Sequence, residues 1–221
     1  EEKLKSTLQE LSVYAKQQHE YIVADFGFPD ELRLKIGAYV ANRTIHILVN
    51  NTGGPAGGQA IDATTDDYVK AFSAHVLCNQ ILVQAIVPGM KQEKFGRIIN
   101  IISTSVKIPL KGLGVSNTIR GAVANWSKTL SFELGPYGIT VNNVLPGATM
   151  TGRLESIIQT NAQKSGKTSE AVQMEMVKEI PLGRIANAHE VAAAIAFLAS
   201  PAAGYINGIN VPVDGGRTGS L

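Results

Sequence analysis

The chain has 221 residues, 44% of them apolar, which is enough to bury the core of one domain spanning 1–221. Its net charge of +2 and dispersed basic residues argue against nucleic-acid or anionic-membrane surfaces and favour a small-molecule or protein partner. The lone Cys78 excludes an internal disulfide and a multi-cysteine zinc site. We find no signal-like N-terminus or membrane-length apolar run, so we expect a soluble cytoplasmic protein that binds no metal.

Two apolar patterns alternate along the chain. Spacings of three and four residues, as in Leu4, Leu8 and Leu11, indicate helices, whereas short continuous apolar runs indicate buried strands. In chain order these patterns predict a helix over 2–18, a strand over 21–24, a helix over 28–42, a strand over 45–49, a helix over 65–88, a strand over 97–102, a helix over 115–134, a strand over 139–144, a helix around 191–198 and a strand over 208–213.

Local signals support some of these boundaries. Thr64 with Asp67 resembles a capping box at a helix start, and Pro88-Gly89 predicts the end of the same helix. A polar stretch over 151–180 separates the strand over 139–144 from the last predicted helix. Strands that are mostly apolar and bounded by helices are typical of an α/β domain whose parallel sheet is covered on both faces.

Short motifs occur at the ends of these elements. They are Asn50-Asn51-Thr52-Gly53, Gly96-Arg97-Ile98-Ile99-Asn100, Ser103, Pro146-Gly147 with Thr151, Pro181-Leu182-Gly183-Arg184, and Val213-Asp214-Gly215-Gly216. In this order, over roughly 200 residues, they resemble the classical short-chain dehydrogenase/reductase family, and most closely its β-ketoacyl-carrier-protein reductase-like branch. The resemblance implies a Rossmann-type doubly wound parallel sheet that binds NADP or NAD.

The resemblance implies a cofactor along the carboxyl edge of the sheet, with a mobile substrate lid over 152–181. The Asn-Gly run and the Pro-Gly turn also have plain readings as loops that end strands, and for Asp25 the two readings are evenly balanced. The alternative interpretation of 152–181 is a surface segment that makes no contact with a substrate. The implied cofactor-binding residues are Asp25, Asn51, Thr52, Gly53, Arg120, Pro146, Gly147, Thr149 and Thr151.

Catalysis in this family uses an asparagine, a serine, a tyrosine and a lysine. The matching positions here hold His75, Ser103, Ser116 and Arg120, so the serine is kept and the other three residues are changed. A serine hydroxyl is much less acidic than a phenol, and a guanidinium binds well but does not pass a proton on. His75 adds acid–base capacity near neutrality, or is a helix residue satisfied by a local hydrogen bond.

The family also begins with a strand, a glycine-rich turn, a helix and a second strand, and this sequence contains no match to them. We therefore expect the natural protein to extend upstream by a first βαβ unit. Two functions remain open. One is an NAD(P)-dependent reductase of a 3-oxoacyl-type carbonyl or acyl-thioester substrate, with a non-standard proton donor. The other is a catalytically impaired binding or partner subunit. Either would form a homodimer or homotetramer through the long helices.

Overall fold

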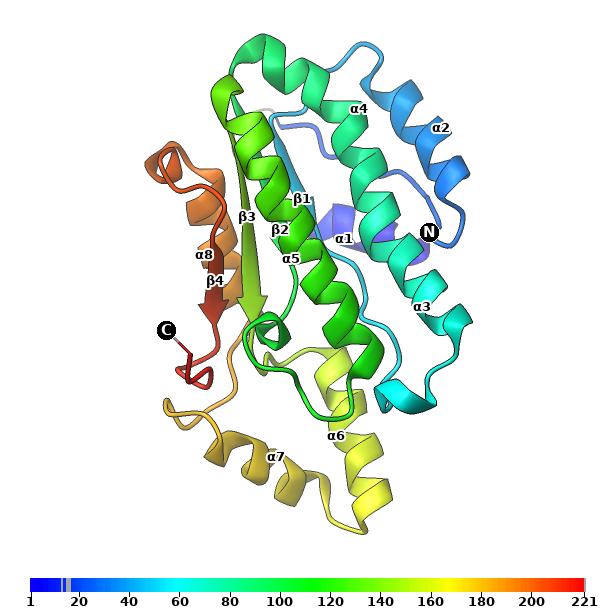
Figure 1. Cartoon of the computed structure of the whole chain (residues 1–221), viewed down its shortest axis with the longest axis vertical. Helices are drawn as coiled ribbons and strands as arrows, with labels where there is room; N and C mark the ends of the chain where they lie inside the picture. Colours follow the sequence, from blue (N-terminus) through cyan, green and yellow to red (C-terminus); the bar gives the residue numbers. More distant parts are fainter. Residues whose placement is uncertain (13, 15–16, 221) are drawn as a thin grey trace.

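Four parallel strands form the sheet of this protein, whose computed structural model describes every residue except 13, 15–16 and 221. The strands β1 (Ile47–Asn50), β2 (Gly96–Ile101), β3 (Ile139–Pro146) and β4 (Asn210–Val213) are neighbours in that order (Figure 1). All three pairings are parallel. β2 and β3 are almost entirely buried, as expected of central parallel strands. The predicted α/β fold with a parallel sheet is confirmed.

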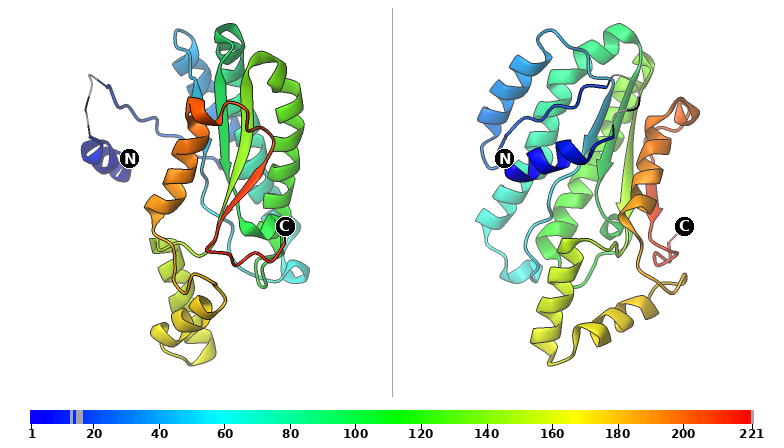
Figure 2. Two further views of the ribbon diagram at one scale, coloured as in Figure 1. Left: turned by 90° about the vertical axis from the view of Figure 1, so that its left-hand side faces the viewer. Right: turned by 180° about the vertical axis from the view of Figure 1, so that it is seen from behind.

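Helices lie on both sides of this sheet (Figure 2). On one face α4 (Cys78–Glu93) contacts β2 and α5 (Gly114–Leu134) contacts β3, while α8 (Ala188–Ala199) contacts β2, β3 and β4 on the other. α2 (Pro29–Val40) packs mainly against α4. The expected cover is incomplete at β1, where Ile47 and Val49 remain more than 40% exposed.

Two helices project beyond the carboxyl ends of the strands (Figure 1). These are α6 (Gly152–Ser165) and α7 (Ser169–Lys178), which pack on each other through Leu154, Ile158 and Val172. They occupy most of the segment 152–181 that the sequence suggested as a lid. Short 3₁₀ turns occur at Ala60–Asp62, Thr104–Val106, Gly135–Tyr137 and Pro201–Ala203.

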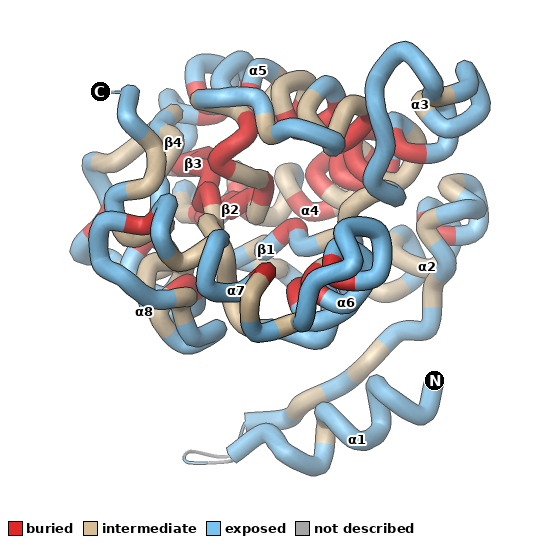
Figure 3. The backbone as a smooth tube through the Cα atoms, turned by 90° about the horizontal axis from the view of Figure 1, so that it is seen from below, coloured by how far each residue is buried: buried red, intermediate tan, exposed pale blue. Residues whose placement is uncertain are grey.

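The core forms two layers because successive strand residues point to opposite faces. Ile98 and Val141 pack under Met90 and Leu130 on the α4–α5 side. Ile99 and Val144 pack with Val191 and Leu198 of α8 on the other side. Seen from below in Figure 3, the buried residues gather in β2, β3 and the helices beside them.

The N-terminal predictions are wrong in two places. The first helix, α1 (Glu2–Glu10), is shorter than 2–18 and buries none of its residues, so little holds it beyond its own backbone bonds (Figure 3). Of the remaining predicted helix, 13 and 15–16 lie outside the described residues. Residues 21–24 form no strand, because no neighbouring strand supplies a hydrogen-bonding ladder there.

The long central helix also differs from its prediction. It begins at α3 (Thr65–Phe72), with the expected capping box of Thr64 and Asp67. It continues through a π-helical turn (Ser73–Leu77) into α4, passing Pro88 and ending at Glu93. Proline removes one backbone donor, but Met90, which is fully buried against the sheet, holds the next turn in place.

The helical run Thr65–Glu93 has the length and apolar composition of a membrane span, with a mean hydropathy of 1.3 in its most apolar window. This run differs from the expectation that the chain has no apolar segment of membrane length. Half of that window is buried inside the protein. A core helix of a globular domain has the same properties, so the length and composition of this run are weak indications of a membrane.

A row of asparagines crosses the whole sheet in register. Asn50, Asn100, Asn143 and Asn210 occupy paired positions on β1 to β4. The side-chain NH2 of each of the first three donates to the side-chain oxygen of the next asparagine, at 2.8, 3.0 and 2.8 Å. Asn100 also donates to Ser127 Oγ at 3.2 Å. This ladder ties the strands together just before the loops that build the site.

Candidate active site

A cavity of about 590 Å³ lies at the carboxyl ends of β1, β2 and β3. Open parallel sheets bind ligands at this edge, where the connecting loops leave a crevice. Side chains from α5, α6 and α8 complete the wall. The cavity brings together most of the residues selected from the sequence: Asn51, Thr52, Gly53, Ser103, Ser116, Arg120, Pro146, Gly147, Thr149 and Thr151.

The loop after β3 is held by backbone bonds on both sides. Gly147 N donates to Val213 O at 2.9 Å, and a Cβ at Gly147 would lie 2.7 Å from Asp214 Cα, so only glycine allows this approach. Thr149 pairs with Ala186 in an isolated parallel bridge. Thr151 caps α6 by accepting from Leu154 N at 3.4 Å. The threonines are therefore presented to the cavity on a fixed loop.

Ser103 lies just past the end of β2 in extended backbone and opens a 3₁₀ turn. Its Oγ accepts a hydrogen bond from Ser105 N at 3.1 Å. That bond uses an oxygen lone pair and leaves the hydroxyl proton free for a ligand. Because Ser103 lines the cavity, it can donate to a carbonyl oxygen bound there.

Ser116 and Arg120 lie four residues apart on α5, on one helical face. They are only 8% and 7% exposed, yet both line the cavity. Arg120 Nη1 donates to Ile101 O at 2.9 Å and Nη2 donates to Thr52 O at 3.2 Å. Burial and then the charge of Arg153 lower the pKa of Arg120 to about 10, so its guanidinium stays positive at neutral pH.

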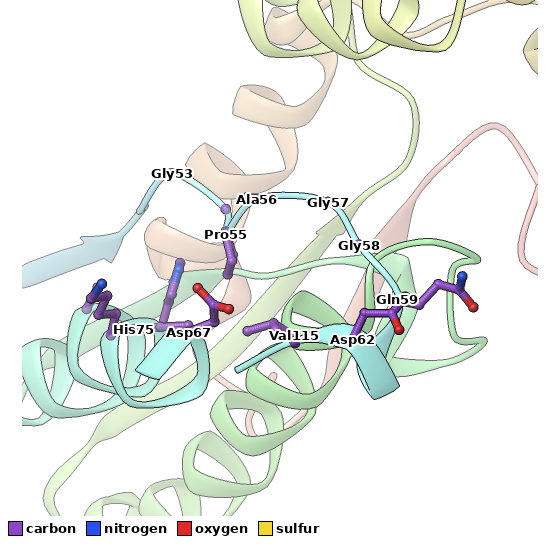
Figure 4. A pocket seen from close by; sticks show the side chains of 15 residues that line it. Gly53, Pro55, Ala56, Gly57, Gly58, Gln59, Asp62, Asp67, His75 and Val115 are labelled. Carbon is purple, nitrogen blue, oxygen red and sulfur yellow. The ribbon is translucent and has the colours of Figure 1, made fainter. Parts of the chain in front are cut away.

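His75 lies behind the site. It is 2% exposed in the π-helical turn, where its Nδ1 lies 2.5 Å from Thr52 Oγ1. It lines a separate cavity of about 440 Å³ with Gly53, Pro55 and Val115 (Figure 4). Burial and then Arg120 lower the pKa of His75 to about 4. The imidazole therefore titrates well below the neutral range that the sequence suggested, and it is neutral at pH 7.

The stability of the folded chain should depend on pH through His75. The imidazole binds a proton near pH 6.5 in the unfolded chain but only near pH 4 in the folded one. Between these values the unfolded state binds more protons, so stability falls as the pH is lowered through that window. In wild type this difference lowers the free energy of unfolding by up to about 3 kcal/mol as the pH falls from 6.5 to about 4. His75→Gln has no titrating group at this position, so its free energy of unfolding should not show that fall. Urea unfolding of both proteins at several pH values measures the difference, and the same pH dependence in both would contradict the burial argument.

Arg153 is a site residue that the sequence analysis missed. It lies in the first turn of α6 and donates from Nη1 to Gly54 O at 2.9 Å and from Nη2 to Pro55 O at 2.8 Å. These bonds join α6 to the loop after β1, the loop in which Arg120 donates to the carbonyl oxygen of Thr52. The signal available in the sequence was a basic residue two positions after Thr151. The carbonyl that Arg153 binds belongs to Gly54, which lies 99 residues away in sequence, so the sequence did not indicate this contact.

Asp25 is the one predicted cofactor residue that the structure leaves outside both of these cavities. Its Oδ1 accepts from Gly27 N at 2.8 Å in a local turn before α2. It does not follow a strand, since 21–24 form none. The structure also brings no group of three or more histidine, cysteine, aspartate or glutamate side chains together for a metal within the part of the chain it describes.

Known proteins match most of this chain. The family profile described as Enoyl-(Acyl carrier protein) reductase matches residues 1–218. The NADPH-dependent reductase BacG of Bacillus subtilis (strain 168) is 31% identical over 177 residues, which cover 80% of this chain and 68% of BacG. The 3-oxoacyl-[acyl-carrier-protein] reductase FabG of Haemophilus influenzae is 33% identical over 172 residues, 78% of this chain and 66% of FabG.

Solved structures give the same result. L-sorbose reductase from Gluconobacter frateurii, complexed with NADPH and L-sorbose, matches with a TM-score of 0.83 and 26% identity, covering 90% of this chain and 77% of that one. The chain therefore spans about two thirds of the length of these curated relatives and about three quarters of this solved one.

Proposed function

The chain belongs to the short-chain dehydrogenase/reductase family, and we propose that it is an NAD(P)-dependent reductase of a carbonyl group of the 3-oxoacyl type. The observation that carries this proposal is Ser103, whose free hydroxyl proton faces a cavity shared with the loops after β1 and β3. A reduced nicotinamide cofactor, NADP or NAD, would supply a hydride to the carbonyl carbon.

The residues present fit the nicotinamide end of such a cofactor. Gly53 has open space where a Cβ would be, so a ligand can approach its backbone. Arg120 offers guanidinium donors to ribose hydroxyls, and Thr149 and Thr151 offer hydroxyl and backbone groups to a carboxamide. Asn51 and Thr52 would bound the adenosine side.

Ser103 would donate a hydrogen bond to the substrate carbonyl oxygen and hold it in place. As negative charge develops on that oxygen, the buried positive charge of Arg120 stabilises it. The proton must then reach the same oxygen. His75 bonds to Thr52, does not line this cavity and is neutral, so we assign this step to a water held by the Ser116 hydroxyl. The hydroxide that this water leaves behind takes a proton from bulk solvent.

Titration of the protein with reduced NADP and reduced NAD, followed by cofactor fluorescence, tests the binding half of the proposal. We expect saturable binding of at least one of the two. Oxidation of the bound cofactor on adding a 3-oxoacyl compound tests the chemical half. Absence of binding to both cofactors would reject the reductase proposal.

One observation favours a second function, a binding or partner subunit with little chemistry. None of the described residues that line the cavity is a histidine, carboxylate, lysine, tyrosine or cysteine, so no side chain there titrates near neutrality.

The triple replacement His75→Asn, Ser116→Tyr, Arg120→Lys separates the two functions, since it restores the proton donor that the family uses. In an enzyme with a water-based relay, we expect the replacement to destroy existing turnover. Turnover that appears only in the triple variant, at a gain on the order of 10²–10⁴-fold, would identify the wild type as the impaired subunit. Steady-state oxidation of the reduced cofactor measures both proteins.

A further inference from the structure

Arg153 joins two segments that flank the carboxyl end of β2. It follows the loop after β3, and it donates from Nη1 to Gly54 O at 2.9 Å and from Nη2 to Pro55 O at 2.8 Å in the loop after β1. Because β1 and β3 are the two neighbours of β2, this contact bridges the end of the strand that Ser103 follows. Arg153, Gly54 and Ser103 line the same cavity.

The guanidinium of Arg153 lies directly against Gly54. A Cβ on Gly54 would be 2.9 Å from Nη2 and 3.2 Å from Cζ, so the guanidinium occupies the space of a side chain there. The backbone of Gly54 has no positive φ, so this contact, and not the backbone conformation, is what requires glycine. The N–H groups of a guanidinium lie in one plane and point in fixed directions, so bonding two successive carbonyls fixes their mutual orientation.

The loop after β1 is anchored at both ends, and Arg153 holds its middle. At one end Thr52 O accepts a hydrogen bond from a side chain of α5 at 3.2 Å. At the other end Gly58 makes backbone hydrogen bonds at the start of α5. The stretch between these anchors separates the two cavities, because Gly53 and Gly54 line both of them. A shift of this stretch therefore changes the shape of the cavity that contains Ser103.

The helix that carries Arg153 is weakly attached to the sheet. α6 packs mainly on α7, and both helices project beyond the carboxyl ends of the strands (Figure 1). The buried side chains Leu154 and Ile158 of α6 form a cluster with Val172 of α7, which holds the two helices to each other. A unit with few contacts to the rest of a domain opens locally at low cost. The two bonds of Arg153 act directly against such opening.

We propose that Arg153 is a positioning residue that latches the α6–α7 pair onto the loop after β1 and so sets the width of the cavity between them. The latch makes the opening of the loop and of the helix pair a single event. Its effect on ligands rests on the proposed reductase function, in which Asn51 and Gly53 bound the cofactor on one side and Thr151 on the other. Loss of the latch weakens binding, whereas the chemical step at Ser103 keeps its geometry.

Hydrogen exchange of the unliganded protein tests the latch without any ligand. Arg153→Gln removes the guanidinium, and Gly54→Ala keeps the charge but displaces the guanidinium with a methyl group. In both variants we expect the backbone amides of 52–58 and of α6–α7 to exchange about 10-fold faster, the effect of losing one net hydrogen bond to a charged group. Arg153→Lys, whose ammonium lacks the planar fork, should give an intermediate increase.

Two matched variants serve as controls for charge and for the added methyl group. Lys164→Gln removes the same charge from the last turn of α6. Gly58→Ala adds a methyl group to the same loop at a position where it meets no atom within 4 Å. Both should exchange as wild type. Unchanged exchange in Arg153→Gln and Gly54→Ala, or an increase confined to one of the two segments, would overturn the latch.

Binding and turnover test the consequence for ligands. Titration with reduced NADP and reduced NAD should give a Kd about 10-fold higher in Arg153→Gln and Gly54→Ala than in wild type. The KM for methyl acetoacetate, a small 3-oxoacyl ester, should rise with little change in kcat, as expected when binding and not the chemical step is impaired. A fall in kcat at unchanged KM and Kd would overturn the positioning role. If wild type binds neither cofactor, the reductase proposal fails, and the exchange measurement still decides the latch.

Discussion

Replacing Ser103 by alanine is expected to lower kcat for carbonyl reduction by about 10²–10³-fold, the usual loss when one donor to a developing oxyanion is removed. The serine oxygen already accepts from Ser105 N, so its proton is the group available to the substrate. Its side chain lies at the end of a rigid, buried strand, so the alanine variant should fold normally. Steady-state rates with reduced cofactor give the comparison.

Ser105→Ala is the matched control. Ser105 is 5% exposed and its side chain does not line the cavity, while its backbone N–H remains in the variant to orient Ser103. We expect near wild-type kcat. If both variants lose activity equally, or if Ser103→Ala keeps it, Ser103 does not polarise the substrate.

Asn100→Ala is expected to lower the free energy of unfolding by about 3–5 kcal/mol, a large effect for a single substitution. Asn100 is 1% exposed at the centre of the asparagine ladder, where it accepts from Asn50 and donates to Asn143 and Ser127. Its removal leaves buried polar groups on both neighbouring strands without partners. Urea denaturation by circular dichroism measures the change.

Asn210→Ala provides the comparison at the edge of the same ladder. Asn210 is partly exposed and accepts one ladder bond, from Asn143, so water can replace it. We expect a loss of about 1 kcal/mol. Equal losses at Asn100 and Asn210 would show that the ladder acts only through packing, because burial of the polar groups would then make no difference.

Much of the fold was predictable because it follows from local patterns. The apolar runs at 45–49, 97–102, 139–144 and 208–213 predicted all four strands to within two residues at each end. The capping box at Thr64 and the long α5 were also predicted. The strand over 21–24 failed because a short apolar run is ambiguous until a neighbouring strand is present.

The structure places most of the residues selected from the sequence around one cavity, but their chemistry was not predictable. Ser103, Ser116 and Arg120 line that cavity, and it was the resemblance to the family that selected them. The position of His75 could not be predicted. It depends on a π-helical turn and on Thr52, a residue 23 positions away, and these decide that the imidazole is buried and neutral.

The sequence by itself determined the class of fold and the family, because motif order and apolar periodicity are local properties of the chain, and it predicted an altered set of residues at the catalytic positions. Only the tertiary structure decided what those residues do together. Burial, hydrogen-bond partners and nearby charges come from segments distant in sequence, as Arg153 and Gly54 show. They set the pKa of His75 and leave Arg120 as a buried cation with no ion-pair partner among the described residues. Proton transfer and ligand binding depend on these non-local terms.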